Sequence, residues 1–160
     1  MTRNILILAF AGALVCGYTA SASAQLADKK GMTLAEAKKL IAAAEDAATK
    51  GKAHMSFAVL DEGGHLVTFE RMDGASLVTV EFAQAKAKTS VLYKAPTDVF
   101  SDGLAKGRTA ILGLPEVAPF GGGFPLKAGD QVVGAIGCSG GNTPTQDSEV
   151  CKVAAAALGK

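Results

Sequence analysis

The segment Gln131–Cys138 constrains the fold more than any other part of this chain. Its sequence, Gln131-Val-Val-Gly-Ala-Ile-Gly-Cys138, is apolar at successive positions and not only at every second one. Because neighbouring side chains of a strand point to opposite faces of a sheet, such a strand must be covered on both sides. The segment therefore predicts a central strand with helices packed over both faces.

The remaining pattern predicts hairpins and helices around that strand. Four more strands are expected at 55–61, 65–71, 116–120 and 124–127, and helices at 33–50, 76–93, 97–106 and from Thr143 onwards. Capping boxes, Thr33 with Glu36 and Thr143 with Gln146, mark the starts of the first and last helices. Hairpins dominate and no regular strand–helix–strand alternation occurs, which predicts an α+β fold: an antiparallel sheet of about five strands flanked by helices.

The first hairpin has two possible registers. A three-residue loop, Glu62-Gly-Gly64, pairs Asp61 with His65 and places Phe57 and Val59 on one face with Val67 and Phe69. A two-residue loop would pair Glu62 with His65 and shift one strand's side chains to the opposite face. It would set Phe57 and Val59 against Thr68 and Glu70, so the hydrophobic match favours the three-residue loop.

The N-terminus has the pattern of a secretory signal. Arg3 precedes an apolar run, Ile5–Val15, and Ala22-Ser-Ala24 offers small residues for a signal peptidase. The run is far shorter than the roughly 20 apolar residues of a membrane span. We therefore expect cleavage after Ala24, a flexible leader at 25–32, a single domain at 33–160, no stable membrane anchor, and a periplasmic or secreted protein. A lipoprotein anchor at Cys16 is the alternative, but Val15 stands where a small residue is expected.

The net charge excludes one class of function, and the cysteine content raises the question of a disulfide. The formal net charge is +1, and it becomes 15 − 15 = 0 when Arg3 is removed with the signal. No basic run could follow a phosphate backbone, which excludes a nucleic-acid binder working through a basic face. Two cysteines, Cys138 and Cys151, remain in an oxidising compartment. They are either a disulfide or two small buried apolar side chains, and the sequence leaves both open.

Sequence motifs for catalysis and metal binding are incomplete. Gly137-Cys-Ser-Gly-Gly141 matches the nucleophile elbow of serine hydrolases, but both histidines, His54 and His65, precede the serine, whereas that fold requires one after it. Two histidines and two separated cysteines are too few for a tetrahedral zinc site. The residues alone therefore indicate an exported α/β domain with a glycine-rich polar site and no assigned catalytic residue.

Seven motifs in matching order resemble the GlcG/HbpS family of haem-binding proteins, and the same module resembles the C-terminal domain of PduO-type cobalamin adenosyltransferases. The resemblance extends from about Thr33 to Leu158. It implies a profilin-like α/β sandwich that often forms homo-oligomers and has members that bind haem. Cys138 departs from the small aliphatic residue expected at its position. The motifs are Val59-Leu-Asp-Glu-Gly-Gly-His-Leu-Val67, Arg71-Met-Asp-Gly-Ala75, Ala85-Lys-Ala87, Gly121-Gly-Gly-Phe-Pro125, Val133-Gly-Ala-Ile-Gly137, Ser139-Gly-Gly141 and Gln146-Asp147.

The expected ligand is therefore haem b, with His65 as the candidate axial ligand to iron. The favoured register places Asp61 across from it, where a carboxylate would fix the tautomer and leave one ring nitrogen for metal. His54, Tyr93, Met72 and Cys151 are the alternative ligands.

Haem propionates need donors, and three groups could supply them. They are Arg71, unless it pairs with Asp73; the backbone of Gly121, Gly122 and Gly123; and Ser139, Gly140 and Gly141 beside the helix start at Gln146. Turn geometry and close packing explain these glycines equally well. We expect His65 and the glycines to share one cavity, within a protomer or across an oligomer interface.

Three functions follow from this cavity. The first is haem storage, transfer or sensing by an exported protein. The second is binding of a small organic carboxylate without iron, through the glycine loops and Arg71. The third, less expected, is an enzyme acting on haem with Asp61 and His65 as its acid–base pair.

Overall fold

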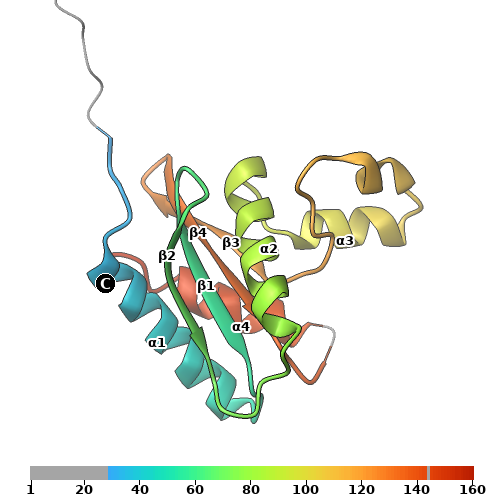
Figure 1. Ribbon diagram of the computed structural model, residues 1–160. Coiled ribbons are helices and arrows are strands. Elements are labelled where there is room, and N and C mark those ends of the chain that lie inside the picture. Colours follow the sequence, from blue (N-terminus) through green and yellow to red (C-terminus); the bar gives the residue numbers. More distant parts are fainter. Residues whose placement is uncertain (1–28, 144) are drawn as a thin grey trace, which may run out of the picture.

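A four-stranded antiparallel sheet forms the centre of the protein. The computed structural model describes residues 29–143 and 145–160. The strands are β1 (Ser56–Asp61), β2 (Leu66–Arg71), β3 (Gly123–Ala128) and β4 (Gln131–Ser139), in the order β2-β1-β4-β3 (Figure 1). Residues 133–139 of β4 are all buried, which confirms the predicted central strand and the α+β class.

Helices cover both faces of this sheet. α1 (Leu34–Lys50) and α4 (Gln146–Ala155) pack against one another and against one face, and α2 (Thr79–Tyr93) packs over β1, β4 and β3 on the other (Figure 1). α3 (Asp98–Ala105) and a 3-10 helix, η1 (Thr109–Gly113), lie to the side of the sheet and contact each other. No helix within the described residues is long and apolar enough to cross a membrane.

The two cores differ in the size of their side chains. Between the sheet and α1/α4, large residues such as Leu40, Ile41 and Phe57 are fully buried. Between the sheet and α2 the core is small, built from Ala58, Leu60, Ala83 and Ala87 with Phe69 at its edge. A Cβ on Gly137 of β4 would fall against the α2 backbone at Ala83 and Ala87. The alanines predicted to face the sheet thus bring α2 almost onto the backbone of β4.

The predicted strand at 116–120 is absent, so the sheet has four strands and not five. α2 side chains take the hydrogen bonds that a neighbouring strand would have made. The Thr89 hydroxyl donates to the Glu116 carbonyl at 2.9 Å and accepts from the Ala118 N–H at 2.8 Å, while the Tyr93 hydroxyl donates to the Pro115 carbonyl. Glu116 also has a left-handed φ of 57°, which interrupts extended backbone.

The predicted register of the first hairpin is wrong over most of its length. The Asp61 N–H does donate to the His65 carbonyl at 2.9 Å, and Leu60 pairs with Leu66. A β-bulge then shifts the pairing, so Val59 lies opposite Thr68 and Phe57 opposite Glu70, as in the rejected register. Because β1 is buried on both faces, matching one apolar face could not identify its register.

The two predicted capping boxes form only in part. The Thr33 hydroxyl accepts from the Glu36 N–H at 3.2 Å, but the Glu36 carboxylate bonds to Lys39 and to the Gly159 N–H instead of returning to Thr33. At the last helix, α4 begins at Gln146, and its N-cap residue, Thr145, makes no side-chain capping bond. The predicted box at Thr143 is therefore wrong, and its Pro144 lies outside the described residues.

Cys138 and Cys151 form a disulfide that joins β4 to α4, with Cα atoms 5.6 Å apart. Both cysteines are fully buried. Of the two readings that the sequence left open, the bridge is the one observed. The predicted signal at 1–24, the alternative anchor at Cys16 and residues 25–28 of the leader lie outside the described residues.

Candidate functional site

A cavity of about 760 Å³ opens between α2, α3, the segment after β4 and the start of α4. Its volume falls in the range of small-molecule sites. It lies at the end of the sheet where β4 finishes with Ser139. The lining residues are Phe82, Lys86, Asp98, Ser101, Asp102, Ala105, Phe120, Gly121, Ser139, Gly141, Asn142, Thr143, Thr145 and Asp147.

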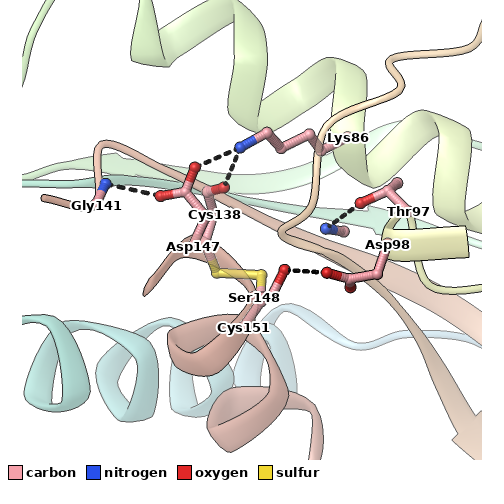
Figure 2. The surroundings of a disulfide bond; sticks show 9 residues. Lys86, Thr97, Asp98, Cys138, Gly141, Asp147, Ser148 and Cys151 are labelled. Carbon is pink, nitrogen blue, oxygen red and sulfur yellow. Dashed lines mark hydrogen bonds and ion pairs between the residues drawn. A yellow bond between two sulfur atoms is a disulfide. The ribbon is translucent and has the colours of Figure 1, made fainter. Parts of the chain in front are cut away.

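A buried ion pair forms the inner wall of this cavity. Lys86 lies on α2 with its side chain only 4% exposed, and its Nζ donates to Asp147 Oδ2 at 2.6 Å and to the Cys138 carbonyl at 3.1 Å. The other Asp147 oxygen, Oδ1, accepts from the Gly141 N–H at 2.7 Å. Figure 2 shows the lysine reaching across to both acceptors. The pair thus connects α2, β4 and α4 at one point.

The disulfide holds the two acceptors of Lys86 together. Cys138 supplies one acceptor through its own carbonyl, and Cys151 lies one helical turn after Asp147, which supplies the other (Figure 2). Asp147 is in the first turn of α4, where the positive end of the helix dipole favours a carboxylate. The covalent bond therefore fixes the spacing between a strand carbonyl and a helix carboxylate that share one ammonium group.

α3 contributes the opposite wall. Asp98, at its first turn, accepts through Oδ1 from the Ser148 hydroxyl at 2.5 Å, and Asp102 follows one turn later. Phe82 and Phe120 form an edge-to-face pair with ring centroids 5.3 Å apart, and Phe120 is half exposed. The cavity thus combines carboxylates, one ammonium group and a small aromatic surface.

Three of the predicted glycine-loop residues line the cavity: Gly121, Ser139 and Gly141. Gly122 and Gly123 are buried and serve packing, because the Gly122 carbonyl accepts from the Cys138 N–H and the Gly123 N–H donates to the Thr97 hydroxyl. A Cβ on Gly121 would meet the Ser148 hydroxyl at 2.5 Å and the Asp98 carboxylate at 2.7 Å. Close packing of α3 against α4 therefore accounts for much of this glycine run.

Gly140 and Gln146 lie behind the cavity wall. Gly140 has a φ of 117°, and a Cβ there would meet the His54 carbonyl. The Gln146 amide accepts from the Asn142 N–H at 2.6 Å and donates to the Gly51 carbonyl at 3.0 Å. Both residues shape the segment between β4 and α4 and are not among those lining the cavity.

His65 and Asp61 lie at the opposite end of β1 from this cavity. Asp61 pairs with Gly134 of β4, whereas Ser56, at the other end of β1, pairs with Ser139. His65 Nδ1 lies 3.4 Å from Asp61 Oδ1, and the His65 side chain is 82% exposed. The expected common cavity of His65 and the glycine loops therefore does not exist within one chain, because the length of β1 separates them.

Asp61 is held by the turn that follows it. Its Oδ1 accepts from the N–H groups of Gly63 and His65, both at 2.9 Å. Partial burial alone would raise the pKa of Asp61, but these two N–H groups, together with the His65 imidazole, bring the pKa below its usual value. The carboxylate is thus ionised at neutral pH and fixed in place beside the ring.

The alternative iron ligands occupy separate places. His54 Nδ1 lies 2.6 Å from the Asp73 carbonyl, and the Met72 sulfur accepts from the Met55 N–H. The Tyr93 hydroxyl is bonded to Pro115, and Cys151, being in the disulfide, is excluded as a thiolate ligand. Over residues 29–143 and 145–160, no three His, Cys, Asp or Glu side chains gather as a metal site.

Arg71 is exposed at the end of β2 opposite Ser56, and it does not line the cavity. Its anticipated ion pair with Asp73 is not among the salt bridges of the described residues. The cavity therefore gains no cation from Arg71.

Comparison with known proteins identifies the family. The model of a family described as "Haem degrading protein HbpS-like" matches residues 32–156. The chain belongs to the HbpS-like family. It is 38% identical to the protein GlcG of Escherichia coli K12 over 100 residues, which span 62% of this chain and 75% of that protein.

Two solved structures show the same fold. A double mutant of HbpS from Streptomyces reticuli superposes with a TM-score of 0.77 at 32% identity, covering 90% of this chain and 98% of that one. The structure described as a PduOC:Heme complex gives a TM-score of 0.73 at 28% identity, covering 81% of this chain and 96% of that one. The predicted family and sandwich fold are confirmed.

Proposed function

We propose that this protein binds haem, and that it does so as an exported protein that stores, transfers or senses it. The observation that carries the proposal is the match to the PduOC:Heme complex over 96% of that chain, together with membership of a family described by its relation to haem. The match covers 81% of this chain, so the proposal does not rest on a short shared fragment.

His65 fits the role of an axial ligand to haem iron. The Asp61 carboxylate faces its Nδ1 at 3.4 Å, and Asp61 is itself anchored by two backbone N–H groups. A proton held on Nδ1 leaves the lone pair of Nε2 for metal. The ring is exposed, so a ligand can reach its free Nε2 from solvent. Bound haem would supply an iron centre for ligation.

The Lys86 cavity fits haem less well. None of its described lining residues is a His, Met, Cys or Tyr, the side chains that ligate haem iron. Three carboxylates, of Asp98, Asp102 and Asp147, face one ammonium, which disfavours two propionates and equally a small organic carboxylate. We therefore propose that haem binds at the end of the sheet that holds Asp61 and His65, here called the hairpin end. The exposed imidazole there suits a site that a second copy completes in a homo-oligomer.

A haemin titration tests the proposal. Adding haemin to the purified protein is expected to produce a Soret band that weakens in His65→Ala and persists in the matched variant His54→Ala. Loss of the band only in His54→Ala would identify His54 as the iron ligand instead. The Nδ1 of His54 also has a hydrogen-bond partner, the Asp73 carbonyl. No spectral change at micromolar haemin would refute haem binding. Sedimentation of the wild type and of His65→Ala tests whether the site needs a second copy.

Two further measurements separate the finer parts of the proposal. With a reductant and oxygen present, stable haem absorbance supports storage or transfer, whereas decay that depends on His65 supports an enzyme acting on haem. Export predicts that the protein recovered from the periplasm or medium begins at Gln25, which intact mass measurement checks. A full-length cytoplasmic product would contradict export.

A further inference from the structure

The Lys86 cavity has no part in the proposed haem site, yet it contains an unusual buried cation. Lys86 is 4% exposed along its side chain, and it faces the cavity from the otherwise small, alanine-rich side of α2. An ammonium carries three N–H donors. Two go to Asp147 and the Cys138 carbonyl, and no described residue accepts the third.

This ion pair needs a reason beyond stability. A buried pair seldom stabilises a fold more than well-packed apolar side chains of the same volume would, because both charges must leave water. Lys86 and Asp147 also lie beside a cavity of about 760 Å³ and are not sealed in a core. A remaining donor on a fixed, dehydrated ammonium is a strong contact for an oxygen atom of a ligand.

The α3 wall of the cavity offers hydrogen-bond acceptors, whereas Lys86 on the other wall offers a donor. Asp98 uses Oδ1 for the Ser148 hydroxyl, and among the described residues nothing donates to its Oδ2 or to the Asp102 carboxylate. Ionised carboxylates only accept. A ligand that spans the cavity must therefore accept from Lys86 and donate to Asp98 or Asp102.

We propose that this cavity binds an uncharged, polyhydroxylated small molecule, such as an open-chain polyol or a cyclitol. A hydroxyl group donates and accepts, so one ligand satisfies both walls. An anion would face three carboxylates, and a diamine, which has only donors, would leave the third N–H of Lys86 without an acceptor. The carbon skeleton rests against Phe82 and Phe120, whose rings form the apolar part of the lining. This site is independent of the haem proposal and lies at the other end of the sheet.

Amide chemical shifts of the ¹⁵N-labelled protein test the proposal. The probes are myo-inositol and glycerol, with succinate and putrescine as charged comparisons. The neutral probes are expected to shift the Gly121, Ser139 and Gly141 resonances in a saturable way. Shifts there only with succinate or only with putrescine would overturn the proposed ligand class, and no saturable shift with any probe would overturn the site.

Variants then assign the contacts. Lys86→Met is expected to weaken binding of the neutral probe about tenfold or more, since a hydrogen bond to a charged group is lost. Lys88→Met, on the same helix in a surface pair with Glu116, should bind as the wild type does. Should Lys86→Met fail to fold, Asp98→Ala and the exposed Asp102→Ala serve instead, and unchanged affinity in both would contradict the proposal. Haemin binding measured on the same samples reports separately on the other site.

Discussion

The two ends of the sheet hold their polar groups in different ways. At the hairpin end, Asp61 and His65 are four residues apart, belong to one turn and remain open to solvent. At the cavity end, Lys86 of α2 is almost fully buried. It is hydrogen-bonded to Cys138 of β4 and Asp147 of α4, which are 52 and 61 positions away in the sequence. The Asp61–His65 pair forms as soon as its turn forms, whereas the contacts of Lys86 require α2, β4 and α4 to be packed together.

At the hairpin end, a residue can be changed with little effect on folding stability. At the cavity end, the polar residues that line the cavity also stabilise the fold. Exposed ion pairs contribute about 0–1 kcal/mol, so the hairpin end can change with little effect on the fold. A buried pair loses far more when one partner is removed, because the other charge stays in the protein without its counter-charge. Mutations at the cavity end should therefore act on stability first.

The largest expected effect comes from removing Asp147. Asp147→Ala leaves the Lys86 ammonium buried with only the Cys138 carbonyl, and we expect the free energy of unfolding to fall by about 3–5 kcal/mol. In the double variant Lys86→Met/Asp147→Ala the stranded charge is gone, so most of the loss should be regained. Urea unfolding of the wild type, both single variants and the double variant gives the coupling energy.

The surface pair Lys88–Glu116 is the matched control, since its side chains are 43% and 55% exposed. Glu116→Ala should cost less than about 1 kcal/mol. If Asp147→Ala cost no more than this control, the two ends of the sheet would not differ in the way argued above.

The disulfide is expected to have the next largest effect. The double variant Cys138→Ala/Cys151→Ala removes a crosslink across 13 residues, and the free energy of unfolding should fall by about 3 kcal/mol. The weakened tie is between β4 and α4, so amide shifts should change near Gly141 and Asp147 and not near Asp61. Changes spread equally to the hairpin end would show that the two ends are coupled through the sheet.

The sequence predicted the features that depend on neighbouring residues. The buried run at Gln131–Cys138 identified the central strand, and helical spacing located α1, α2 and α3 to within about three residues at each end. The false strand at 116–120 contains the strand-forming residues Val117 and Phe120, but Pro119 within it is a local sign against a strand. Its backbone hydrogen bonds go to the Thr89 hydroxyl, and such a side-chain partner, more than twenty residues away, leaves no local signal.

The cavity could not be predicted in the same way. In the sequence, Lys86 and Asp147 stand out only as parts of family motifs, because nothing local shows that residues 61 positions apart meet. One signal was available: Lys86 interrupts the buried side of a helix whose neighbours Ala83 and Ala87 face the sheet. A charged residue in such a position needs a partner and marks a site to search for. Asp98 and Phe82 carried no comparable signal.

The smallest expected effect is at Asp61, and it depends on pH. The folded-state pKa of Asp61 is lowered, so its ionised form stabilises the fold above its unfolded-state pKa of about 3.9, and this contribution is lost as the pH falls through the folded-state value. Asp61→Ala should therefore cost about 1 kcal/mol at pH 7 and progressively less below pH 4.

Urea unfolding at several pH values measures that convergence. Asp46→Ala, an exposed carboxylate on α1, serves as the control and should follow the wild type throughout. A cost at Asp61 that stayed constant down to pH 3 would mean that the side chain stabilises the turn by packing and not by its charge. Because Asp61 also faces the His65 imidazole, the same variant should weaken the Soret band if the carboxylate holds the ring for iron. An unchanged band would leave Asp61 as a turn residue alone.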